Sequence, residues 1–142
     1  MSAELLFSML NLTAMAGWLL LAAFPRHAWI RRAIAGRLIP MMLAIVYIGL
    51  IASQWGSEGS FGSLAGVATL FSNPWVLLAG WVHYLAFDLL IGVAEVEDAQ
   101  ARHVPPLYLI PCLFLTFMFG PAGWLLYQGV RRIVGRDAVA HT

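Results

Sequence analysis

The sequence predicts an all-α integral membrane protein: a bundle of four transmembrane helices, with a short interfacial helix between the second and the third. The first observation is composition, because 61% of the 142 residues are hydrophobic and only 11% are charged. Soluble domains are about half apolar and about a quarter charged. The second is that the apolar residues form long runs, and the third is that arginines gather at the ends of those runs. Lipid is therefore the expected solvent of the protein.

The single domain of residues 1–142 is expected to hold four spans, at about 3–24, 36–54, 74–94 and 106–129. Each is close to the roughly 20 residues that cross the hydrocarbon of a bilayer. The first run has neither the basic leader nor the cleavage site of a signal peptide, and Pro25 ends it. Asn73 and Pro74 supply an N-cap and a first-turn proline for the third span. Gly120 and Pro121 break or kink the fourth.

The connection between the second and third spans is expected to carry a short helix within about residues 61–72. Ser63 can cap it, and the apolar residues that follow recur at helical spacing through Phe71. A short helix with one apolar side favours a position flat in the membrane interface.

The distribution of arginines predicts the orientation. The connection 25–37 carries four of the eight arginines, so it should face the cytoplasm and leave the N-terminus outside. Four spans would place the C-terminus outside as well. Arg131, Arg132 and Arg136 follow the last span, however, so the tally, with Arg102, is five arginines inside against three outside. A bacterial inner membrane is the expected location.

Composition also excludes several classes of protein. With a formal net charge of +1 and no basic face, a nucleic-acid partner is not expected. Cys112 is the one cysteine, so neither a disulfide within the chain nor a cysteine zinc cluster can form. Only His83 among the four histidines lies in the middle of a span, which argues against a haem held by two histidines. No metal and no cofactor are expected.

The third span contains the residues expected to carry chemistry. An aspartate at the centre of a transmembrane helix costs about 2.5–3.5 kcal/mol on insertion scales, so Asp88 should be sheltered by protein or water. Tyr84, one turn earlier, lies on the same side of the helix. His83 is about 140° around the helix from Asp88, so the two cannot form a direct pair in a regular helix. Either residue could instead be a hydrogen-bond tie between helices.

Five further residues are expected to line a substrate pocket: Asn11, Trp81, Glu95, Cys112 and Thr116. Asn11 is the strongly polar side chain deep in the first span and should point toward the third. Trp81 and Glu95 share the stripe of Asp88.

Two of these assignments have alternatives. Glu95 lies near the membrane edge with Glu97 and Asp98, where solvated charges pairing with Arg102 are the simpler reading. Cys112, Thr116 and Gly120 recur every four residues, and such a stripe of small residues suits close helix packing, including packing against a second copy of the chain.

The segment Trp81-Val-His83-Tyr-Leu-Ala-Phe-Asp88-Leu resembles the signature of the neoxanthin-synthase-like (abscisic-acid-deficient-four-like) membrane proteins. The stretch from Pro111 through Gly120-Pro121-Ala-Gly123 is similar to a second block of the same family. The first span, with Asn11, Trp18 and Pro25, fits as well, so the resemblance covers nearly the whole chain.

The resemblance implies an activity. Plant relatives act in converting the epoxide of violaxanthin to the allenic alcohol of neoxanthin, an isomerisation that needs no redox cofactor. By this resemblance Asp88 would donate a proton to the epoxide oxygen with help from Tyr84, and His83 would take or relay the vinylic proton. The substrate would be a carotenoid-like lipid or another isoprenoid.

Two other functions remain open at this stage. The first is a non-catalytic membrane binder of carotenoid, quinone or haem, or an accessory protein of a pigment pathway. The second is a transport or structural role, with a homodimer formed through the small-residue stripe. The acidic residue that a small multidrug transporter needs in its first helix is replaced here by Asn11, which disfavours proton-coupled export.

Overall fold

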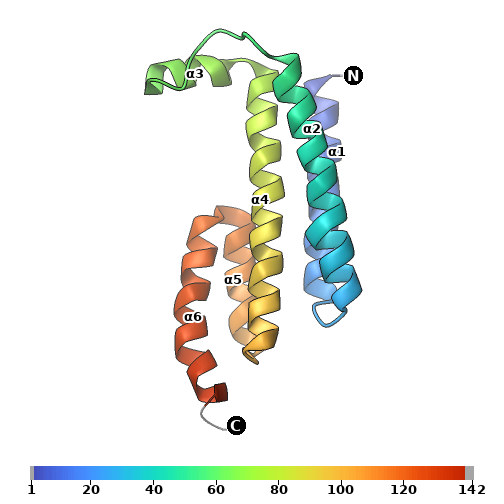
Figure 1. Cartoon of the computed structure of the whole chain (residues 1–142), viewed down its shortest axis with the longest axis vertical. Coiled ribbons are helices and arrows are strands. Elements are labelled where there is room, and N and C mark those ends of the chain that lie inside the picture. The colour runs from blue at the N-terminus through green and yellow to red at the C-terminus, as the bar shows by residue number, and fades with distance from the viewer. Residues whose placement is uncertain (1, 140–142) are drawn as a thin grey trace.

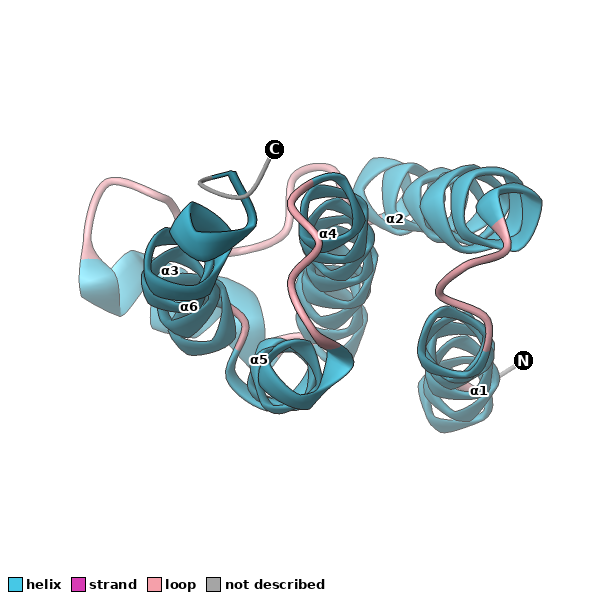
Figure 2. Ribbon diagram, turned by 90° about the horizontal axis from the view of Figure 1, so that it is seen from below, coloured by secondary structure: helices cyan, strands magenta, loops and turns pink. Residues whose placement is uncertain are grey.

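The computed structural model describes residues 2–139, which form helices joined by short connections. In chain order these are α1 (Ala3–Ala23), η1 (Ile30–Leu38), α2 (Ile39–Ser53), α3 (Leu64–Ser72), α4 (Pro74–Ala101), α5 (Pro106–Phe119) and α6 (Pro121–Val139). Helix α4 is the centre of the molecule, with α1 and α2 on one side and the pair α5–α6 on the other (Figures 1 and 2). All sites described below depend on the two faces of α4.

Among the described residues, three helices are long and apolar enough to cross a membrane. They are Ala3–Ala23, the continuous helix Ile30–Ser53 formed by η1 and α2, and Pro74–Ala101. The second begins earlier than the predicted residue 36, because η1 takes Arg31 and Arg32 into the helix instead of the connection. Both arginines are tied to Glu97 of α4, at N···O distances of 3.6 and 2.8 Å.

The predicted fourth span, 106–129, is wrong as a single helix. The chain breaks at Gly120, whose φ of 39° is accessible to glycine, and Pro121 starts a new helix that runs back along α5 (Figure 1). No Cβ fits at Gly123, which packs directly on the backbone of Thr116. We call this pair, Pro106–Val139, the hairpin. At about 1.5 Å per residue, α5 is roughly 21 Å long and too short to cross about 30 Å of hydrocarbon.

Because of the hairpin, the last helix does not end on the side of the molecule where the sequence predicts it. Helix α6 ends at the opposite end of the molecule from the start of α1 (Figure 1). The α1–η1 connection, the α4–α5 connection and the end of α6 all lie together there. The arginines lie in the α1–η1 connection, in η1, after α4 and in the second half of α6, which places them toward this end of the molecule; we call it the arginine end. The conflict between five and three arginines disappears.

The short helix predicted between the second and third spans is confirmed as α3, which lies across the end opposite the arginine end (Figure 1). Ser63 caps it, accepting from the amide of Gly66 at 3.0 Å. Asn73 then caps α4 by accepting from the amide of Trp75 at 2.9 Å, as its sequence predicts. The placement of α3 in a membrane interface stays a prediction.

Apolar packing joins α1, α2 and α4. The side chains of Leu21, Leu43 and Leu89 are completely buried between these helices. Glycines allow the helices to approach closely, since a Cβ on Gly92 would overlap the ring of Trp18. Large apolar side chains also cover much of the outer surface, as expected for a molecule solvated by lipid.

Candidate functional site

Asp88 lies at the middle of α4 and faces the turn of the hairpin. The residue is only 7% exposed, and its Oδ2 has no hydrogen-bond partner among the described residues. A Cβ built on Gly120 would lie 2.8 Å from Oδ1 and 3.1 Å from Oδ2, so the carboxyl occupies the space that this glycine leaves open. A buried polar atom without a partner costs free energy and is uncommon in folded proteins.

The break in the hairpin gives this carboxyl an unusual neighbour. The first amide groups of a helix have no partners within it and carry a partial positive charge. Helix α6 begins directly after Gly120, so its N-terminal end lies beside Asp88. Tyr84, one turn earlier on α4, donates from its hydroxyl to the backbone carbonyl of Phe117 at 3.2 Å. Tyr84 thereby fixes the end of α5 next to the carboxyl.

His83 lies on a different side of α4. Its side chain is exposed at the molecular surface. The ring lies 5.6 Å from that of Tyr47 of α2 and 4.7 Å, edge-on, from that of Phe87 of α4, measured between centroids. The structure therefore does not bring His83 and Asp88 together, in agreement with their predicted separation around the helix.

Asn11 and Trp81 join α1 to α4. The indole nitrogen of Trp81 donates to Asn11 Oδ1 at 3.0 Å, which confirms that Asn11 points toward the third span. Trp81 also lies against Tyr84, with ring centroids 5.3 Å apart.

Glu95 is not a solvated charge at the membrane edge, and that alternative is wrong. It is 2% exposed, and the Thr116 hydroxyl contacts its two carboxyl oxygens at 2.9 and 3.1 Å. Cys112 is also completely buried and donates to the carbonyl of Tyr108 at 3.2 Å. Both small residues are thus buried inside the chain, and packing against a second copy of the chain stays a prediction.

The sequence did not reveal the partner of Asp98. The hydroxyl of Tyr127, a residue only 1% exposed, donates to Asp98 Oδ2 at 2.7 Å. Asp98 also pairs with Arg102, as expected, and with Arg131 of α6. Asp88, Glu95 and Asp98 therefore all face the hairpin. Tyr127 could not be found by pattern, because its role depends on α6 folding back.

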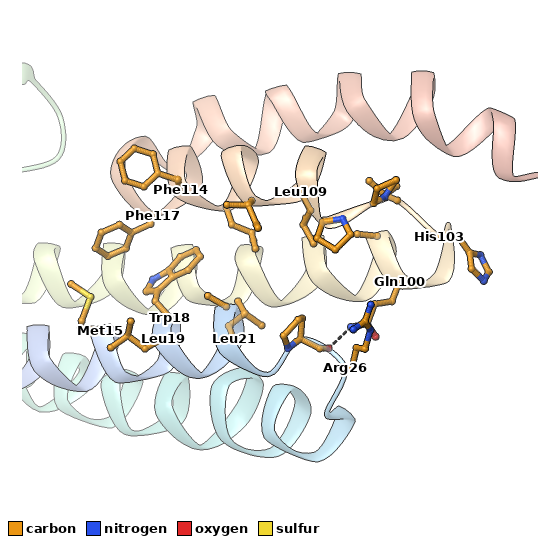
Figure 3. A pocket seen from close by; sticks show the side chains of 18 residues that line it. Met15, Trp18, Leu19, Leu21, Arg26, Gln100, His103, Leu109, Phe114 and Phe117 are labelled. Atoms are coloured by element: carbon orange, nitrogen blue, oxygen red, sulfur yellow. Dashed lines mark hydrogen bonds between the residues drawn. The ribbon is translucent and has the colours of Figure 1, made fainter.

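A pocket of about 790 Å³ opens between α1, the end of α4 and α5 (Figure 3). Its walls are mainly apolar, with Trp18 and Leu21 from α1 and Leu109, Leu113 and Phe117 from α5. None of the eight predicted site residues is among those that line it. Trp18, which contributes to the resemblance in the first span, forms part of this wall.

The polar groups of the pocket gather at one end (Figure 3). Arg26, Gln100 and His103 lie there, at the arginine end of the molecule. The carbonyl of Pro25 accepts from the side chains of both Gln100 and Arg31, which ties this end of the pocket to α4 and η1. His103 has a φ of 56°, in the left-handed region, where the chain turns from α4 toward α5.

Phe117 connects the pocket to Asp88. Its ring lies edge-on to Trp18, with centroids 5.5 Å apart, and both rings line the apolar end of the pocket (Figure 3). Its backbone carbonyl accepts from Tyr84 on the other side. One residue thus separates the pocket from the Tyr84–Asp88 pair. Within residues 2–139, no group of three or more histidine, cysteine, aspartate or glutamate side chains is arranged to hold a metal ion.

Comparison with known proteins gives one match. The family model described as ABA DEFICIENT 4-like matches residues 5–127, which is most of the chain. No curated protein and no solved structure matches significantly. The matched region includes the first span, the Trp81–Asp88 segment and the turn of the hairpin, where the predicted resemblance was placed. The chain therefore belongs to the ABA4-like family.

Proposed function

We propose that this protein binds a carotenoid-like lipid within a membrane and isomerises it by acid-base chemistry at Asp88. One observation carries the proposal: a buried carboxyl with an unpartnered oxygen lies at a helix break, one residue away from an apolar pocket. Broken helices at membrane depth are tolerated where they are buried or line cavities. Membership of the ABA4-like family supports a carotenoid-related role.

The pocket suits one end of a long apolar molecule. Its wall on α1 extends from Met15 to Ala22, which is about 10 Å of helix at about 1.5 Å per residue, and it continues to Pro25 in the connection that follows. A linear isoprenoid would lie along this wall with its reacting end toward Phe117. Reaching Asp88 requires the Phe117 ring to turn aside, since it lines that end of the pocket.

A single carboxyl can both donate and accept the proton that this isomerisation transfers. Protonated Asp88 donates to the epoxide oxygen, the carbon–oxygen bond breaks, and the oxygen becomes a hydroxyl. The electrons of the vinylic C–H bond form the new double bond of the allene, and the carboxylate takes that proton. The carboxyl therefore begins and ends protonated, and the substrate is converted to an isomer. The N-terminal end of α6 stabilises negative charge on the carboxylate or on the departing oxygen.

Tyr84 and His83 have different parts in this scheme. Tyr84 holds the Phe117 carbonyl and so positions the turn beside Asp88. His83 faces α2 and the outer surface, so it acts on the substrate only if the substrate also lies across that side of α4.

Pigment analysis in a carotenoid-producing host tests the proposal. Asp88→Asn should abolish the change in pigments, and His83→Ala should reduce it only if the substrate crosses the α2 side of α4. Glu97→Gln is the matched control, since Glu97 is a half-exposed carboxylate of the same helix that pairs with Arg32. Unchanged pigments in Asp88→Asn, at a normal expression level, would exclude Asp88 as the acid.

A second function is favoured by the lining of the pocket. Among the described residues that line it, the ionisable side chains are Arg26 and His103, both at the arginine end, and none is a carboxyl. This arrangement suits a non-catalytic binder of carotenoid, quinone or haem. The absorption spectrum of the purified protein separates the two functions, because a retained chromophore without turnover favours binding.

We also propose that the arginine end faces the cytoplasm of a bacterial cell and that the N-terminus lies outside. The eight arginines that lie toward this end support this orientation through the positive-inside rule. The hairpin would then enter the inner membrane from the cytoplasmic side and return. A green fluorescent protein fused after α6 should fluoresce, and alkaline phosphatase fused there should be inactive. The opposite pattern would refute this orientation.

A further inference from the structure

The pocket has a polarity that the proposed isomerisation does not use. At one end Trp18 and Phe117 form an apolar wall, and at the other lie Arg26, Gln100 and His103 (Figure 3). Helices α1 and α5 form opposite walls of the pocket between these two ends (Figure 3). A molecule that fills the pocket must therefore present an apolar part to one end and a polar part to the other.

The polar end of the pocket contains an arginine that is not paired with a carboxylate. Arg31, Arg32, Arg102 and Arg131 are each paired with a carboxylate of α4. Arg26, in contrast, has no ion-pair partner among the described residues, and no aspartate or glutamate lines the pocket. A guanidinium beside an apolar pocket without a carboxylate complements an anionic group on the guest.

We propose that the pocket binds a linear isoprenoid that ends in an anionic group, with the anion at Arg26 and His103 and the chain directed toward Phe117. The isoprenoid nature of the chain rests on the proposed function. The anionic end group does not, because it follows from the charges of the pocket. The fully anchored guest would present its far end at Phe117, next to Asp88.

Binding of a carboxylate and its neutral ester tests the head group. All-trans-retinoic acid and methyl retinoate share one isoprenoid chain and differ only in charge at the end. In phosphatidylcholine nanodiscs, with empty nanodiscs as the blank, tritiated retinoic acid should bind about tenfold more tightly than the ester, the effect of one charge-assisted hydrogen bond. Equal affinities of the two compounds would overturn the proposal.

Two pairs of variants locate the site. Arg26→Gln should remove the preference for the acid, whereas Arg132→Gln should keep it, because Arg132 is exposed at the same end but does not line the pocket. Ile110→Trp should block both compounds by filling the pocket, and Leu107→Trp, at an exposed position of α5 outside the lining, should not. Loss of the preference in Arg132→Gln to the same extent as in Arg26→Gln would refute a specific contact.

Two further comparisons distinguish the remaining outcomes. If an anionic phospholipid of the bilayer is the true occupant, phosphatidylglycerol added to the nanodiscs will displace retinoic acid completely, and the proposal fails. Head-group selection is measured by the binding of retinoic acid in nanodiscs, whereas catalysis at Asp88 is measured by the pigments of a producing host. A failure of catalysis and a failure of head-group selection are therefore distinct results.

Discussion

The two sides of α4 are built by different chemistry. Toward α1 and α2 the helix presents apolar side chains such as Leu89, which is completely buried and lies against Gly17. Toward the hairpin it presents three acidic residues, Asp88, Glu95 and Asp98. The first side is held mainly by close apolar packing. On the second side, Glu95 and Asp98 accept hydrogen bonds from groups that lie there only because α5 and α6 fold back.

The largest expected effect lies on the apolar side. Leu89→Ala should lower the free energy of unfolding by about 2–5 kcal/mol, because it removes a completely buried side chain between α4 and α1. Leu90→Ala, at the neighbouring exposed position, should change it by less than about 0.5 kcal/mol. Thermal unfolding in detergent measures both. Similar losses in the two variants would show that α1 and α4 are not packed as described.

A smaller effect is expected on the hairpin side. Thr116→Val should lower the stability by about 1–3 kcal/mol, because it leaves the buried carboxyl of Glu95 without its hydroxyl partner. Thr13→Val is the matched control, since the Thr13 hydroxyl bonds only to the carbonyl of Met9 in its own helix. The same unfolding measurement applies. If the control loses as much stability as Thr116→Val, the contact between α4 and α5 is not what holds the hairpin.

The smallest expected effect is a gain in stability instead of a loss. Asp88→Asn should raise the stability by up to about 1 kcal/mol, because at neutral pH an aspartate must take up a proton in order to be buried uncharged, whereas the amide is already neutral. The buried Oδ2 of Asp88 has no partner that would offset this cost. Gain of stability with loss of activity would mark Asp88 as a residue kept for function. A clear loss of stability would instead mark it as a structural tie between α4 and the hairpin turn.

Sequence reasoning found the local features of the molecule more reliably than its contacts. Ser63 and Asn73 cap their helices as predicted, and Asn11 meets the third span, because capping groups and deep polar residues have few other ways to satisfy their hydrogen bonds. The angle between His83 and Asp88 also followed from helical geometry alone. These predictions depend only on neighbouring residues within one helix or on the lack of water around a polar side chain.

The pocket and the hairpin could not be found in this way. Gly120 and Pro121 indicated a break, but a kink and a complete reversal have the same sequence pattern. The reversal is decided by the packing of Gly123 on Thr116 and by the bonds of Glu95 and Tyr127, all of which join residues from different helices.

The sequence by itself determined that the chain consists of apolar helices, where most of them begin and end, and which polar groups must be buried. It could do so because hydrophobicity, helix caps and prolines act within a few residues of one another. Only the packing of the helices shows that the last apolar run folds back, that the arginines lie toward one end, and that a pocket lined by none of the predicted residues opens on the far side of Phe117 from Tyr84. These features depend on how side chains from separate helices fill a shared space, which no single helix encodes.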